Sequence, residues 1–156
     1  MPYPSVSLIR AQSYDRTQLR ASLETLLEPL GGMETFVKPG ARVLLKPNLL
    51  TGARPGKECV TRPELVYCVA QMVQAVGGKP FLGDGPAFGS AFGVAKANGY
   101  LPLTQELGLP IVEFHGKRYE TVSEEFNHLL LCKEAIDADV VINLPKLKSH
   151  VQLTMT

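Results

Sequence analysis

The hydrophobic positions along the chain change period several times, which separates predicted helices from predicted strands. Five leucines recur on one face of a helix that precedes Gly31-Gly32, and they are Leu19, Leu23, Leu26, Leu27 and Leu30. Ser13 or Asp15 is a candidate N-cap for this helix, because short polar side chains accept hydrogen bonds from the first free amides. The glycine pair supplies its end.

Short apolar runs bounded by turn residues predict five strands, at residues 5–10, 42–45, 79–82, 111–114 and 140–144. Thr61 and Glu64 have the spacing of a capping box, with Pro63 in the first turn, so a helix is expected to follow Thr61. Residues 90–107 predict one helix broken near Gly99 or two short ones. A hairpin is expected from 117–122 and 128–132, and a helical turn at 133–137.

Strands that alternate with helices favour right-handed βαβ crossovers and a mostly parallel sheet. The predicted fold is therefore α/β, with helices on both faces of the sheet. Residues 1–156 make either a single domain or the N-terminal portion of a larger one. Ligands of such sheets bind beyond the carboxyl ends of the strands. Residues that follow the second, third and last predicted strands should therefore meet at one rim.

Composition narrows the classes of function. Hydrophobic residues make up 45% of the chain and charged residues 20%, which is typical of a globular protein. A net charge of +1 argues against general binding to nucleic acid or to a membrane surface. Cys59, Cys68 and Cys132 lack C-x-x-C spacing and are interpreted as reduced thiols. No secretory signal or membrane-length apolar run is seen, so a cytoplasmic location is expected.

Polar residues are grouped at the end of the last predicted strand. Asn143 lies within the strand, and Lys146, Lys148 and His150 come after Pro145. Lysines at a strand exit are either solvated charges or the binding groups of an anionic ligand. His150 is a candidate general acid or base, a metal ligand or an ordinary polar side chain.

Two earlier segments point to the same rim. Lys46 and Asn48 flank Pro47 at the end of the second strand, where they form either a solvated turn or part of an anion site. Asp84 lies between Gly83 and Gly85, and is expected to bind a metal, orient a lysine or cap the turn. The helix that follows has an N-terminus that could receive an anion.

The common catalytic fingerprints are absent. The chain lacks the glycine spacing of dinucleotide and P-loop sites, the histidine spacing of zinc proteases and the serine elbow of α/β-hydrolases. His115 and His128 are interpreted as surface residues. No dedicated metal site is predicted.

Four segments, taken in order, resemble the family called domain of unknown function 362. They are residues 43–48, 61–64, 83–86 and 143–150. Members of this family often carry a ferredoxin-like 4Fe–4S segment beyond the domain. The resemblance implies that this chain is the N-terminal portion of such a domain and does not itself bind the cluster.

The function expected from these features is binding of a small anionic metabolite or cofactor within an iron–sulfur-linked redox enzyme. Ligand-binding residues would be Lys46, Asn48, Asn143, Lys146 and Lys148. Asp84 and His150 would be the titratable catalytic pair. The alternative is a non-catalytic docking or assembly module for a redox partner.

Neither a nucleic acid nor a membrane is an expected partner. If later strands are missing from the sheet, an open edge remains after His150, and this edge favours a homo-oligomer.

Overall fold

A computed structural model describes residues 5–52, 59–119, 129–150 and 154–155. Its elements are α1 (Arg16–Leu27), the 3-10 helix η1 (Glu28–Leu30), α2 (Met33–Phe36), β1 (Arg42–Pro47), α3 (Pro63–Ala75), β2 (Lys79–Gly83), α4 (Ala91–Ala97), α5 (Leu101–Leu107), β3 (Ile111–Val112), β4 (Gly116–Tyr119), β5 (Leu129–Cys132), α6 (Lys133–Ile136), β6 (Val140–Leu144), β7 (Ser149–His150) and β8 (Thr154–Met155).

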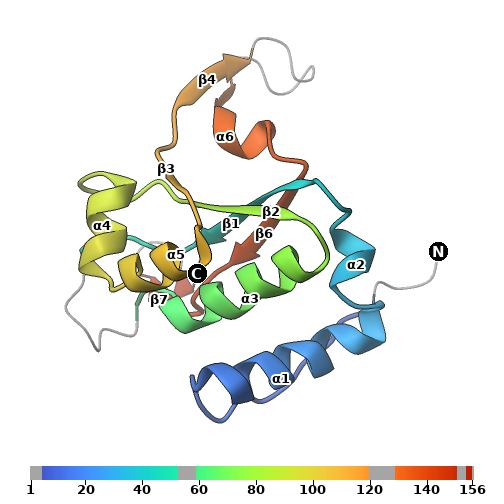
Figure 1. Cartoon of the computed structure of the whole chain (residues 1–156). Helices are drawn as coiled ribbons and strands as arrows, with labels where there is room; N and C mark the ends of the chain where they lie inside the picture. The colour runs from blue at the N-terminus through green and yellow to red at the C-terminus, as the bar shows by residue number, and fades with distance from the viewer. Residues whose placement is uncertain (1–4, 53–58, 120–128, 151–153, 156) are drawn as a thin grey trace.

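The centre of the fold is a parallel sheet with the strand order β3-β2-β1-β6. Helix α3 crosses one face of it, and α1 packs on α3 from the outer side (Figure 1). Helix α6 and β4 lie on the opposite side of the sheet (Figure 1). The predicted α/β class is confirmed.

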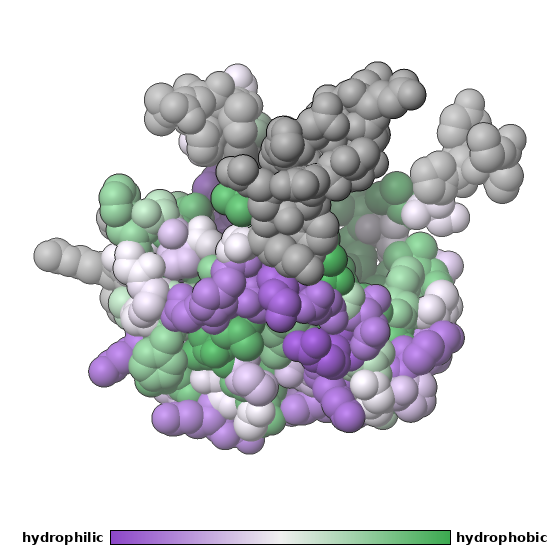
Figure 2. Space-filling model, turned by 90° about the horizontal axis from the view of Figure 1, so that it is seen from above, coloured by the Kyte–Doolittle hydropathy of each residue, from purple (hydrophilic) through white to green (hydrophobic). Residues whose placement is uncertain are grey.

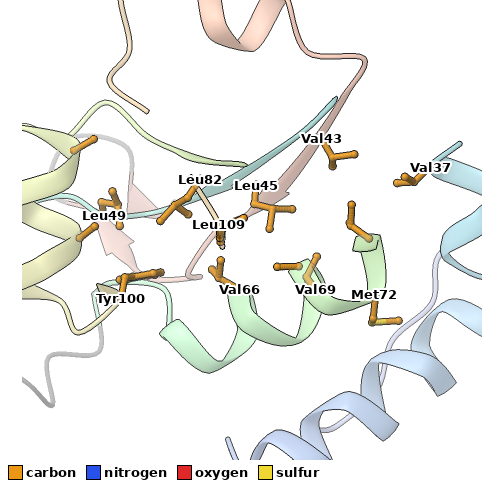
Figure 3. Close-up of a cluster of buried hydrophobic side chains, with 14 of the residues drawn as sticks. Val37, Val43, Leu45, Leu49, Val66, Val69, Met72, Leu82, Tyr100 and Leu109 are labelled. Carbon is orange, nitrogen blue, oxygen red and sulfur yellow. The ribbon is translucent and has the colours of Figure 1, made fainter. Parts of the chain in front are cut away.

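The main core fills the space between the sheet and α3. Val43, Leu45 and Leu82 point from the strands toward Val66 and Val69 of the helix (Figure 3). The strand residues are fully buried, because β1 and β2 occupy the middle of the sheet. Alternation along each strand sends the next side chain to the other face.

The other face of the sheet has a smaller apolar cover. Leu44 is fully buried there, although it points away from α3. A Cβ added at Gly83 would lie 2.5 Å from ring atom Cε1 of Phe114. Glycine at the end of β2 therefore allows the ring of Phe114 to pack against the sheet. Seen from this side, a hydrophilic band crosses the molecule between hydrophobic areas (Figure 2).

Several local predictions are confirmed. The Asp15 carboxylate accepts hydrogen bonds from the amides of Thr17 and Gln18 and caps α1. The 90–107 region forms two short helices, α4 and α5. The predicted hairpin is the antiparallel pair β4–β5, which makes a two-stranded sheet of its own.

The prediction of a strand at residues 5–10 is wrong. This segment has no secondary structure, and Val6 and Leu8 are 88% and 94% exposed. An alternating pattern makes a strand only where a neighbouring strand pairs with its backbone, and no such neighbour lies beside this segment in the described sheets.

β6, the last predicted strand, is at an edge of the four-stranded sheet, and its residues are alternately half-buried and exposed. Only the side chains that face α3, those of Val140, Ile142 and Leu144, pack against the main core. The described part of the chain contains no helix with the length and apolar character needed to cross a membrane.

Candidate functional site

The exits of β1, β2 and β6 lie at one rim of the sheet, because these strands are parallel and adjacent. Lys46 is in register with Asn143 of β6, so the two side chains are neighbours on the same face. Asp84 follows the end of β2 directly. The structure therefore brings together Lys46, Asp84 and Asn143, which belong to three separate segments of the sequence.

An ion pair organises this rim. The ammonium of Lys46 lies 2.8 Å from Oδ1 of Asp84. The Asp84 side chain is 9% exposed and the Lys46 side chain 37% exposed, so the carboxylate is enclosed while the ammonium still reaches solvent. The other carboxylate oxygen of Asp84 accepts a hydrogen bond of 2.8 Å from the amide of Leu49. Of the roles considered for Asp84, the geometry supports orientation of a lysine.

Thr61 connects the exits of β1 and β6. Its hydroxyl accepts a hydrogen bond of 2.9 Å from the amide of Asn48 and donates one of 2.7 Å to the carbonyl of Leu144. The amide of Thr61 donates to the carbonyl of Asn48, at 3.1 Å. Thr61 is 2% exposed, so these groups satisfy one another away from water.

The predicted capping box is therefore wrong. The N-cap of α3 is Arg62, which makes no side-chain capping bond, and Pro63 is at the start of the helix. The hydroxyl of Thr61 is used for the link between strands instead of for the helix. The sequence contained a usable signal, because a proline at the first helical position makes the residue before it the N-cap.

Tyr100 supports Thr61 from the helical side. It is 1% exposed, and its hydroxyl donates a hydrogen bond of 2.6 Å to the carbonyl of Thr61. Burial raises the pKa of Tyr100 above its usual range, and the nearby charges of Asp84 and Glu64 raise it further. The phenol therefore stays protonated at neutral pH and remains a donor.

The chain beyond β1 is held in an uncommon conformation. Leu50 has a φ of 57°, in the left-handed region that non-glycine residues seldom adopt. Its carbonyl accepts a hydrogen bond from the amide of Ala87, and the side chain of Asn98 donates to the carbonyl of Leu49. These hydrogen bonds to two other segments maintain the conformation of Leu50. Residues held in such seldom-populated backbone conformations are common in functional loops.

The helix N-terminus expected to receive an anion is already occupied by a side chain of this protein. The carboxylate of Glu113 accepts hydrogen bonds from the amides of Ala91 and Phe92 at 2.8 Å and 3.1 Å. Ser90 caps the same helix through the amide of Gly93. Sequence reasoning missed Glu113, because its pairing depends on the placement of β3 beside α4.

The other predicted site residues follow the strand exits in the sequence, Asn48 after β1 and Lys146, Lys148 and His150 after β6. Asn48 and Lys146 are half-buried, as is Lys148, and Asn143 is exposed. The backbone of His150 belongs to β7, while its side chain lies outside the described part of the structure. His128 also lies outside the described residues.

His115, predicted to be a surface residue, is 73% exposed but paired. Its Nδ1 lies 2.7 Å from Oε1 of Glu134, and its backbone amide donates to Oε2 at 2.8 Å. These hydrogen bonds lower the pKa of Glu134 to about 2, with the bond from the His115 amide as the largest cause. The pair joins the residue before β4 to α6, away from the rim.

The described cysteines do not fit an iron–sulfur cluster. Cys68 is fully buried within α3, and burial raises the pKa of its thiol. Cys59 and Cys132 are half-buried free thiols. Across the described residues, no three His, Cys, Asp or Glu side chains are grouped as a metal site would require.

Comparison with known proteins gives the family. The family model described as "Domain of unknown function (DUF362)" matches residues 43–156. The chain belongs to this family. It is also similar to the thylakoid-associated protein sll1697 of Synechocystis sp. (strain ATCC 27184 / PCC 6803 / Kazusa), with 74% identity over 152 residues.

That alignment covers 97% of this chain and 47% of the relative, so the chain spans about half the length of the curated relative it matches. No solved structure matches this chain. The matched family region begins within β1 and contains β2, β6 and all the residues of the rim described above. Family membership thus agrees with the resemblance noted from the sequence motifs.

Proposed function

We propose that this DUF362 chain binds a small anionic metabolite or cofactor at the carboxyl ends of β1, β2 and β6. The observation that carries the proposal is the ammonium of Lys46, which is oriented by the enclosed carboxylate of Asp84 while its side chain stays 37% exposed. An ammonium bound to one carboxylate oxygen retains further N–H donors for a ligand.

Lys146 and Lys148 would supply the net positive charge of the site, since Asp84 neutralises Lys46. Asn143, beside Lys46 in the parallel ladder, would orient the ligand by hydrogen bonds. Asn48 would do the same from the end of β1, where Thr61 holds its backbone. Asp84 and His150 would be the groups that transfer protons.

We further propose that the site operates within an iron–sulfur-linked redox enzyme. The support for this is the family resemblance alone. Because the described cysteines do not fit a cluster, its ligands would have to come from another polypeptide segment. The present residues would then bind and orient the anion and move protons.

Ligand-dependent stability tests the binding proposal. We would add inorganic phosphate, pyrophosphate and small carboxylates to the purified chain and measure its Tm. A ligand at one hundred times its Kd stabilises the folded state by about 2.7 kcal/mol. At ~2–4 °C per kcal/mol for a domain of this size, the expected rise is roughly 5–10 °C.

Three lysine variants separate the site from general charge effects. Lys46→Met and Lys146→Met should abolish the rise in Tm. Lys79→Met makes the same charge change at the start of β2, on the opposite rim, and should keep it. Calorimetry on Lys146→Met would show lost binding even if Lys46→Met folds poorly. Equal ligand binding by all three variants would refute the anion site.

A docking or assembly module for a redox partner is the second candidate. It is favoured by the internal neutralisation of Lys46 and by exposed apolar side chains after the strands, with Phe88 78% and Leu147 73% exposed. This function predicts no thermal shift with any small anion. It predicts instead that Phe88→Ser and Leu147→Ser weaken capture of a redox partner.

The location of the protein is also a proposal. The sequence favours a cytoplasmic protein, whereas the name of the relative associates that protein with the thylakoid. We propose that this chain shares that association. Recovery of the chain in the soluble fraction alone, after gentle lysis and membrane separation, would contradict it.

A further inference from the structure

A cleft of about 290 Å³ lies between α1, the start of α3 and the segment that precedes α1. Residues 9–14, which form no strand, therefore have a structural role as one wall of this cleft. Most of the lining side chains are large and apolar, and they are Ile9, Tyr14, Leu19, Leu23, Leu26 and Leu65. Only Leu19 among them is fully enclosed by the protein, so apolar surface stays open to a ligand.

The hydroxyl groups in the cleft already donate hydrogen bonds within the chain. Ser22 donates one of 2.9 Å to the carbonyl of Gln18, and Ser13 donates one of 2.9 Å to the side-chain oxygen of Gln18. The cleft therefore offers a ligand mainly apolar contacts, and one well-placed charged group beside it would fix the orientation of that ligand.

Arg62 is such a group. Its Cζ lies over the ring of Tyr14, 4.9 Å from the ring centre, and Leu65 is three residues farther on, on the same side of α3. In the described part of the chain the guanidinium makes no hydrogen bond or ion pair, and its Nε is buried without an acceptor. Glu64 does not neutralise it, because side chains two positions apart on a helix do not face each other.

The volume of the cleft limits the apolar part of a ligand. An apolar cavity of about 150 Å³ holds one benzene molecule, so a cleft of about 290 Å³ has room for roughly twelve carbon atoms. That is the size of one medium-length acyl chain. The two long chains of a membrane lipid would not fit.

We propose that this cleft binds a single-chain amphiphile with an anionic head group, of the medium-chain carboxylate class. The apolar chain would cover the half-buried side chains of Leu23, Leu26 and Leu65, and the head group would bind the guanidinium of Arg62. This site shares no residue with the anion site proposed at the strand exits.

Methyl NMR of the leucine-labelled chain tests the site directly. Dodecanoate, kept below its critical micelle concentration, should shift the methyl signals of Leu23, Leu26 and Leu65 until the site is saturated. Butanoate has the same head group but eight fewer methylenes, and should bind the cleft roughly a hundredfold more weakly or worse. Dodecyltrimethylammonium has the same chain but a cationic head group, and should bind about tenfold more weakly or worse, because Arg62 repels it.

Two variants test the chain and head-group contacts separately. Ser22→Trp places a large ring in the cleft and should abolish the shifts. Thr25→Trp makes a similar change on α1 outside the cleft, at a residue whose hydroxyl likewise bonds to its own helix, and should keep them. Arg62→Met should weaken dodecanoate binding about tenfold or more, whereas Arg20→Met, which removes an arginine that pairs with Glu24, should not.

The proposal would be overturned if dodecanoate caused no saturable shift of these leucine signals, or if Ser22→Trp left the shifts unchanged. Equal binding of dodecanoate and dodecyltrimethylammonium would overturn the anionic head group, as would unchanged binding by Arg62→Met. The ligand series needs no variant, so it decides the matter even if one variant folds poorly. Because the signals report only on the cleft, none of these results bears on anion binding at the strand exits.

Discussion

Replacement of Thr61 by valine would test how the rim is held together. Valine has nearly the same shape as threonine but no hydroxyl, so the core contacts remain while both hydrogen bonds of the side chain are lost. The amide of Asn48 would lose an acceptor at 2.9 Å, and the carbonyl of Leu144 would lose a donor at 2.7 Å. Both groups lie next to a side chain that is 2% exposed.

The expected cost follows from these two unsatisfied groups. Each buried polar group left without a partner costs about 1–3 kcal/mol. Because the Asn48 carbonyl still receives the amide of Thr61, the segment stays near its place, and a total of roughly 2–4 kcal/mol is expected. Thr61→Ser keeps the hydroxyl and loses one methyl group, so it should cost only about 1 kcal/mol.

Urea unfolding, followed by circular dichroism, measures both variants. With an m-value of about 2 kcal/mol/M, Thr61→Val should lower the urea midpoint by roughly 1–2 M, and Thr61→Ser by clearly less. The reasoning would be refuted if Thr61→Val cost less than about 0.5 kcal/mol, a change typical of ordinary surface substitutions. Equal losses in the two variants would also refute it, since the hydroxyl would then be irrelevant.

Two further predictions concern the charged pairs. Asp84→Asn should destabilise the fold by about 1–3 kcal/mol, because Lys46 loses its counter-charge. The amide of Leu49 keeps an oxygen acceptor in this variant. Lys46→Met should cost more in the same urea assay, since it leaves an enclosed carboxylate unpaired, and a smaller loss would contradict this account. The hydrogen bonds to Glu134 hold the pKa of its carboxyl near 2, below the usual 4.5. The stabilisation of the folded state by these bonds should therefore be complete above about pH 4.5 and lost as the pH falls toward 2. A carboxyl NMR titration should give a Glu134 pKa near 2 in the wild type. In His115→Ala, which retains the backbone donor, this pKa should rise only in part. A return of the pKa to 4.5 would assign the whole shift to the imidazole.

The sequence by itself determined the local elements and the chemistry of the rim. Leucine periodicity defined the first helix, Asp15 its cap, and the apolar runs the four strands of the sheet. The parallel βαβ pattern was enough to place Lys46, Asp84 and Asn143 at one rim, because the carboxyl ends of adjacent parallel strands must lie together.

Tertiary structure alone decided how these groups are used. Only the placement of β1 beside both β2 and β6 turned Thr61 from an apparent helix cap into a link between two strand exits. The pairing of Lys46 with Asp84 and the use of Glu113 at α4 likewise join segments far apart in the sequence. Spacing along a chain reports hydrogen bonds within one element, whereas bonds between elements depend on how their buried faces pack.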